Sequence, residues 1–301
     1  MFRTSRASTA ALFVIVGMGT GCAGSVDLSD SDRASVDETA AMAVSAYLGP
    51  LTFAWPLDCS VPVTETVEKN DDVVVISFSV TASDGPRGLE VAFSDTTVVS
   101  VNNQKVTAAE NSSLSPYFSY PTMIVDRGPN AELLDVNGYF AAEQRLEESV
   151  SSLPPGVAHE FAVNYMDQLW SAWVSAWSNT DIEESVVESI SSEGEPAETT
   201  KLESRPTATG TAHLVFERVT TDAGPEVLSA VSDLIGPEPS DLEQINLTGT
   251  FRVATMTDPT TLMPSVAEHE IRFSGAGEGE PVDARKRRVW LFDWKASNCP
   301  A

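Results

Sequence analysis

The sequence has little cysteine, histidine or positive charge, and each shortage excludes a class of function. Its 301 residues include three Cys and three His. Neither Cys59 nor Cys299 has a second Cys or His at the close spacing that zinc sites use. Lys and Arg number 18 against 44 Asp and Glu, which gives a formal net charge of −26 at pH 7. Because a polyanion without a concentrated basic face does not bind another polyanion, we expect no nucleic-acid partner.

The recognisable catalytic motifs are also missing. The sequence contains no Gly-x-Ser-x-Gly elbow, no Ser three residues before a Lys, no phosphate-binding loop and no dinucleotide-binding glycine pattern. His159-Glu160 and His269-Glu270 each begin like a zinc-protease motif, but no second His follows four residues after the first. We therefore predict a protein that is not an enzyme and has no cofactor or metal. A hydrolase that uses carboxylates alone stays open, because the chain is rich in acidic residues.

The first residues predict export. Arg3 and Arg6 precede an apolar stretch over residues 10–18. This stretch is shorter than the ~20 apolar residues that cross a bilayer. A short positive segment, a short apolar segment and small residues after it are typical of a secretory signal peptide. We expect residues 1–21 to be this signal peptide and to lie outside the folded body.

The residues after the apolar stretch predict a membrane anchor. Gly19-Thr20-Gly21-Cys22 resembles the lipobox of bacterial lipoproteins. In that class the Cys becomes the mature N-terminus and carries lipid, which implies an exported, membrane-anchored protein of the cell envelope, periplasmic or on the outer surface. The family usually has a large apolar residue where this chain has Gly19, and ordinary cleavage after Ala23 is the alternative. Small and acidic residues follow, so we expect a tether over residues 22–50 with one short helix in it.

Two cysteines remain once Cys22 is assigned to the lipid. An exported protein meets an oxidising compartment, where an even pair of Cys residues forms a disulfide. We therefore predict a bond between Cys59 and Cys299, which would join the start of the folded body to its end. Two separate buried thiols are the alternative.

Alternation of apolar and polar residues predicts strands on both sides of the middle of the chain. The clearest run covers residues 73–83, where every second residue is apolar. A hairpin is expected around Gly128-Pro129-Asn130. The last strand has apolar residues on both faces, which is typical of a strand that is covered on both sides. The other expected strands cover residues 89–93, 123–125, 133–136, 211–220, 245–253, 267–273 and 288–295.

The middle of the chain predicts two helices, over residues 139–152 and 157–178. Aromatic side chains form a stripe along the second helix, and packing as core is the ordinary interpretation of such a stripe. The alternative is that they line a gap between helix and sheet that holds an acyl chain or another apolar ligand. Periplasmic lipoprotein carriers place a curved sheet over helices in this way, which is an analogy of fold only. The candidate ligand-binding residues are Phe161, Tyr165, Trp170, Trp173 and Trp177.

These elements predict an α+β fold, with an antiparallel curved sheet and a central helical insertion of two helices packed on one face. Strands come first, the helices interrupt, and strands return. A bond between the two cysteines would bring the first strand close to the last, which favours one closed or half-closed sheet. We expect a single domain over residues 51–301, with a mobile acidic connection near residues 179–206.

The chain has one basic cluster after the signal peptide, and it comes directly before the end of the folded body. The cluster consists of Arg285, Lys286, Arg287 and Arg288. A solvated turn leading into the last strand is the ordinary interpretation. The alternative is a contact for lipid phosphates or for an acidic partner.

Together these observations predict a non-catalytic lipoprotein of the cell envelope. Its partners would be the membrane, through the N-terminal lipid, and either an apolar small molecule or an envelope protein bound at the membrane surface. A structural or assembly component without a ligand pocket is the first alternative, and the carboxylate-dependent hydrolase is the second.

Overall fold

The computed structural model describes residues 51–114, 118–137, 157–178, 198–206, 211–220, 246–276, 282–297 and Cys299. The expected signal peptide, the tether and Cys22 therefore lie outside the described residues. So do the expected helix over residues 139–152 and residues 179–197 of the expected acidic connection.

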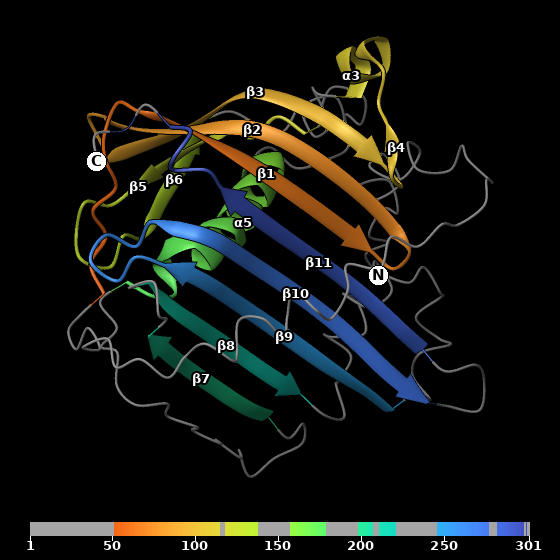
Figure 1. Cartoon of the computed structure of the whole chain (residues 1–301). Helices are drawn as coiled ribbons and strands as arrows, with labels where there is room; N and C mark the ends of the chain where they lie inside the picture. Colours follow the sequence, from red (N-terminus) through yellow and green to blue (C-terminus); the bar gives the residue numbers. More distant parts are fainter. Residues whose placement is uncertain are drawn as a thin grey trace.

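In the described part of the chain, eleven strands form one antiparallel sheet that curves around a helix (Figure 1). Ten strands follow the order β6-β5-β3-β2-β1-β11-β10-β9-β8-β7, and β4 pairs with β3. The strands are β1 (Ser60–Lys69), β2 (Asp72–Asp84), β3 (Leu89–Val101), β4 (Gln104–Lys105), β5 (Thr122–Val125), β6 (Leu133–Asn137), β7 (Glu198–Pro206), β8 (Ala212–Thr220), β9 (Asn246–Thr257), β10 (Pro264–Ala276) and β11 (Val282–Phe292).

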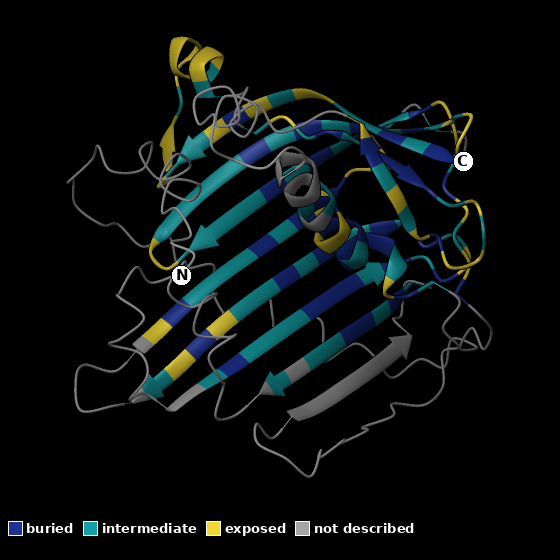
Figure 2. Cartoon of the chain, turned by 180° about the vertical axis from the view of Figure 1, so that it is seen from behind, coloured by how far each residue is buried: buried dark blue, intermediate teal, exposed yellow. Residues whose placement is uncertain are grey.

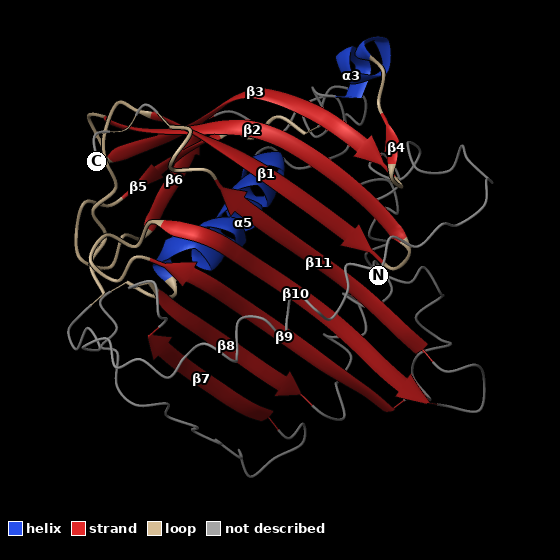
Figure 3. Ribbon diagram, in the orientation of Figure 1, coloured by secondary structure: helices blue, strands red, loops and turns tan. Residues whose placement is uncertain are grey.

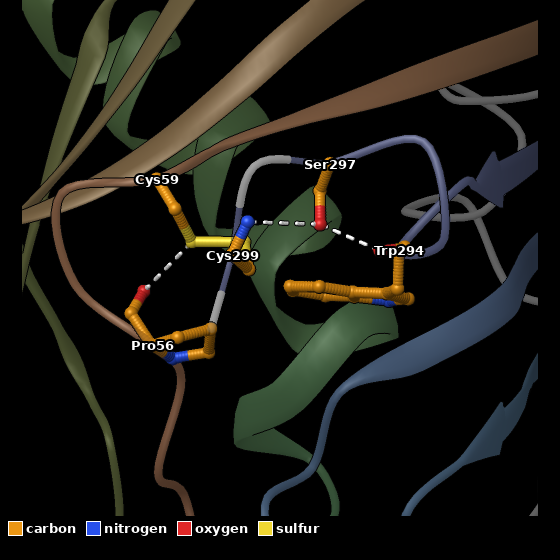
Figure 4. The surroundings of a disulfide bond; sticks show 5 residues. All are labelled: Pro56, Cys59, Trp294, Ser297 and Cys299. Atoms are coloured by element: carbon orange, nitrogen blue, oxygen red, sulfur yellow. Dashed lines mark hydrogen bonds between the residues drawn. A yellow bond between two sulfur atoms is a disulfide. The ribbon is translucent and has the colours of Figure 1, made fainter. Parts of the chain in front are cut away.

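The first and last strands are neighbours at the centre of the sheet. β1 and β11 run antiparallel, with Glu65 opposite Trp290. Cys59 lies directly before β1 and Cys299 lies a few residues after β11, and their Sγ atoms are bonded at 2.03 Å (Figure 4). The predicted disulfide is therefore present in the structure. It links the two strands that meet at the centre.

The described helices are few. α3 (Ala108–Leu114) is a short surface helix, and Thr107 and Glu110 cap its N-terminus reciprocally. α5 (Val157–Trp170) continues as a π-helix, η2 (Ser171–Ser175). Figure 2 shows α5 and η2 lying across the concave face of the sheet, toward one end of the strands. This confirms a helix over most of residues 157–178, although no sequence pattern indicated the change to π geometry.

Aromatic rings make up much of the core where η2 meets the sheet. The Trp173 ring packs edge-on against Phe292 at 4.9 Å between ring centroids, and against Trp290 at 5.9 Å. Trp170 packs on Trp55 at 5.3 Å, and its indole N–H donates to the Ala131 carbonyl. The large side chains that are most deeply buried are Trp170, Trp173, Trp177, Trp290, Phe78, Leu51, Ile76, Met123, Ile124, Met166 and Leu169.

The predicted α+β class is wrong, because strands dominate the described structure (Figure 3). The described residues form a mostly β fold with one large antiparallel sheet. Several strands are longer than the apolar alternation suggested, since hydrogen bonding to a neighbouring strand extends them into polar sequence. β3 continues to Val101, and β1 was not predicted at all.

Two further expectations need correction. Residues 198–206 were assigned to the acidic connection, but they form β7 and pair with β8 along their whole length. The last strand was expected to be covered on both faces. Trp290 and Phe292 are buried on the concave side, whereas Leu291 on the convex side is 49% exposed. No described element covers the convex face at this strand, so only the helix side is buried.

Candidate functional site

The basic cluster lies inside β11 and not in a turn before it. Side chains alternate between the two faces of a strand, so the cluster is divided. Arg285 and Arg287 lie on the convex face, and Lys286 and Arg288 lie on the concave face with the buried Trp290. The solvated turn expected here is therefore wrong. Half of the cluster points toward the helix side of the sheet.

The convex half of the cluster is paired with carboxylates on neighbouring strands. The Arg287 guanidinium contacts Glu268 at 2.8 Å and Glu68 at 3.5 Å. The Arg285 guanidinium contacts Glu270 at 3.2 Å. These partly buried ion pairs form a network that joins β1, β10 and β11 on the convex face.

Arg288, from the concave half, contacts a carboxylate that is completely buried. Glu65, on β1, is 0% exposed. Its Oε1 lies 3.7 Å from Nη1 of Arg288, and its Oε2 accepts a hydrogen bond from the Tyr120 hydroxyl. The Arg288 guanidinium also stacks over the Tyr165 ring, 4.3 Å from the centroid. Residues from β1, β11, α5 and the segment before β5 thus converge on one point of the concave face.

Burial and charge oppose each other at Glu65. Burial raises the pKa of the Glu65 carboxyl, and the Arg288 charge and the Tyr120 hydrogen bond offset only part of this effect. Burial, together with the Glu65 charge, raises the pKa of Tyr120 well above its ordinary value. The phenol therefore keeps its proton and acts as the donor to Glu65.

Lys286 and His269 extend this cluster toward the far end of the strands. His269 lies opposite Arg288 on β10, and Ile271 lies opposite Lys286. Burial lowers the pKa of the Lys286 ammonium, an effect that the Glu65 carboxylate opposes. The pKa of His269 falls to about 4, first through burial and then through the charge of Lys286. At neutral pH the imidazole is therefore uncharged. We call Glu65, Tyr120, Tyr165, His269, Lys286 and Arg288 the inner polar cluster.

Replacing His269 with glutamine is expected to remove about 2 kcal/mol of pH dependence in the free energy of unfolding between about pH 7 and about pH 5. The folded-state pKa is about 4 against an ordinary value of 6.5. The unfolded state therefore takes up its proton first as pH falls, and stability decreases on acidification. Urea unfolding at both pH values measures the difference.

If His269→Gln lost as much stability between the two pH values as the wild type does, the buried neutral imidazole would be contradicted.

Apolar side chains surround the inner polar cluster on the concave face. Val67, Val74, Phe251 and Ile271 point to this side, as the strand registers show, and each is half-buried. The inner residues beneath α5 and η2 are by contrast fully buried. The concave face beyond the helix therefore presents apolar groups that the described structure leaves partly exposed.

The aromatic residues of the second helix have two different surroundings. The side chains of Trp170, Trp173 and Trp177 are fully buried in the hydrophobic core, each at most 1% exposed. The apolar hollow beside this aromatic core, bordered by Trp55 and Phe292, has no space for a water molecule. Tyr165 belongs to the inner polar cluster, and the side chain of Phe161 lies outside the described residues.

A separate open cleft of about 420 Å³ lies beside η2. Its lining residues are Asn130, Glu132, Leu133, Asp167, Ser175 and Ser178. Partial burial raises the pKa of Asp167, but both carboxylates of the cleft are on exposed residues. A hydrolase that works with carboxylates alone needs one of them kept protonated by its surroundings. These two exposed residues do not resemble such a pair.

Comparison with known proteins does not place this chain in a family. No protein-family profile matches it, and no curated protein is similar to it in sequence. The site must therefore be judged on its own chemistry. Among the described residues, no three His, Cys, Asp or Glu side chains gather as metal ligands. None of the described helices combines the length and apolar character needed to cross a bilayer.

Sequence patterns missed the centre of the cluster. Glu65 and Tyr120 were not singled out, because a single carboxylate in an acidic chain carries no signal. The one clue was the alternation of Val61, Val63 and Val67 on β1, which places Glu65 on the apolar face. The sequence showed His269 as the start of an incomplete zinc-protease motif. It is buried at 5% exposure, but its Nε2 has no hydrogen-bond partner in the described structure.

Proposed function

We propose that this protein is a non-catalytic lipoprotein of the cell envelope that holds an apolar chain against the concave face of its sheet. One observation supports an apolar ligand. Beyond α5, the concave face has a group of half-buried apolar side chains, among them Val67, Phe251 and Ile271. Apolar surface left in contact with water on a concave face favours an apolar ligand. The convex face instead carries paired charges.

The envelope location rests on the N-terminal sequence. The short positive and apolar segments, followed by Cys22, are typical of an exported chain that receives lipid. A disulfide between Cys59 and Cys299 is consistent with that compartment, because such bonds persist where the surroundings are oxidising. A lipid on Cys22 would keep the folded body at the membrane surface, close to a supply of apolar chains.

Native mass spectrometry of the protein purified from its own envelope tests both parts of the proposal. We expect a chain that begins at Cys22 and carries added lipid, together with a species that is heavier by one bound apolar molecule. Ile271→Gln should reduce the bound fraction about tenfold, since it removes apolar contact from the concave face.

Leu291→Gln is the matched control for this experiment. Leu291 lies on the convex face of the neighbouring strand and is 49% exposed, so this change should leave the bound fraction as it is in the wild type. Thermal unfolding of both variants checks that they fold. Wild-type protein recovered with no bound molecule would refute the ligand, and an unmodified Cys22 would refute the anchor.

A further inference from the structure

We infer that Lys286 and Arg288 bind the anionic group of an amphipathic ligand, a phosphate or carboxylate attached to the apolar chain. This inference rests on the proposed function and names the chemistry of its ligand. It begins from an imbalance of charge. In a chain with net charge −26, Lys286 and Arg288 lie on the concave face beside one buried carboxylate, and a third cation, Lys69, lies opposite Lys286 on the same face.

The single carboxylate of the cluster is already engaged. Glu65 pairs with Arg288 and accepts the Tyr120 hydrogen bond. No described carboxylate lies within 4 Å of the Lys286 ammonium as an ion pair, so its charge is compensated only at longer range by Glu65. A cation that is withdrawn from water without a close partner is unfavourable, and an anion brought to it would be bound strongly. The cluster therefore lacks one negative charge.

A buried hydrogen-bonding atom without a partner lies in the same part of the concave face. His269 is 5% exposed, and its Nε2 has no hydrogen-bond partner in the described part of the chain. Buried polar atoms normally have partners, so one without a partner next to two cations suggests that a ligand supplies it. In the tautomer that carries its proton on Nε2, the neutral imidazole would donate this N–H to an oxygen of the anion.

The surroundings of Lys286 suit a chain attached to the anion. Ile271 lies opposite Lys286 on β10, and Phe251 lies opposite Ile271 on β9. The ring of Phe251 also packs against His269 at 5.1 Å. An anionic group at Lys286 and Arg288 would thus continue directly into half-buried apolar side chains. A small inorganic anion would use the cations and leave these groups in water.

Two fluorescent probes that differ only in charge test the inference. cis-Parinaric acid carries a carboxylate, and its methyl ester has the same chain without charge. We expect the wild-type protein to bind the acid about tenfold more tightly than the ester. Lys286→Gln should abolish this preference and keep the affinity for the ester. Lys286→Arg should restore the preference, because the charge returns.

Arg287→Gln is the matched control, since Arg287 is the next residue on β11 and points to the convex face. It should bind both probes as the wild type does, and thermal unfolding should show that each variant folds. Equal wild-type affinities for acid and ester would overturn the anionic group while leaving the proposed function intact. Binding of neither probe would overturn both. Titration with inorganic phosphate identifies the remaining outcome, in which phosphate alone binds at Lys286 and a free anion replaces the amphipathic ligand.

Discussion

Replacing Arg288 with glutamine is expected to lower the free energy of unfolding by about 3 to 5 kcal/mol at neutral pH. The variant would leave the Glu65 carboxylate at 0% exposure without the cation that lies 3.7 Å away. Desolvation of an unpaired charge is one of the few causes that produce an effect of this size. Urea unfolding followed by tryptophan fluorescence measures the loss, because the aromatic core reports on folding.

A double-mutant cycle separates the charge from the packing of Arg288. Glu65→Gln combined with Arg288→Gln should recover much of the stability that the single change loses, since no charge is then left unpaired. The loss in Arg288→Gln should also shrink on acidification, because burial already raises the pKa of Glu65 and a protonated carboxyl needs no cation. A double variant as unstable as the sum of its two single variants would contradict this account.

Removing the disulfide by Cys59→Ser and Cys299→Ser together is expected to lower the free energy of unfolding by up to about 5 kcal/mol. The two residues are 240 positions apart, so the bond closes a very long loop and strongly restricts the unfolded chain. Urea unfolding of the wild type and the double variant measures the difference.

Reduction of the wild-type protein is the natural control for the disulfide. A reducing agent should lower the stability of the wild type to that of the double variant and should leave the variant unchanged. Equal stability of wild type and variant without reductant would contradict the prediction. So would quantitative alkylation of Cys59 and Cys299 in protein that has not been reduced.

The sequence predicted strands whose apolar face carries no charged residue. β2, β9 and β10 were all expected from alternation, and the β5–β6 hairpin was expected from its turn residues. β1 was missed because Glu65 stands in the middle of its apolar face. β7 was missed because its sequence is mostly polar; it lies at one end of the strand order and pairs with β8.

The candidate site was predicted only in parts. Lys286 and Arg288 were singled out as members of a basic cluster. The direction of their side chains depends on whether the cluster forms a turn or a strand, and a turn was expected. Strand geometry sends them to the concave face and sends Arg285 and Arg287 to the convex face. Tyr165 was chosen as an aromatic residue of the helix, and its contact with Arg288 depends on how the helix crosses the sheet. Such contacts between distant segments leave no mark in a single sequence.

The pairing of β1 with β11 has a consequence for how the chain folds. Hairpins between consecutive strands, such as β2 with β3 and β9 with β10, form early because little chain entropy is lost. The pairing of β1 with β11 can form only after the last strand is available, because it joins the first and last strands of the sheet. It closes the longest loop among the strand pairs, at the largest cost in chain entropy. We therefore expect slow folding in which two halves assemble separately. Until they join, β1 would present an unpaired edge on which another chain could add a strand.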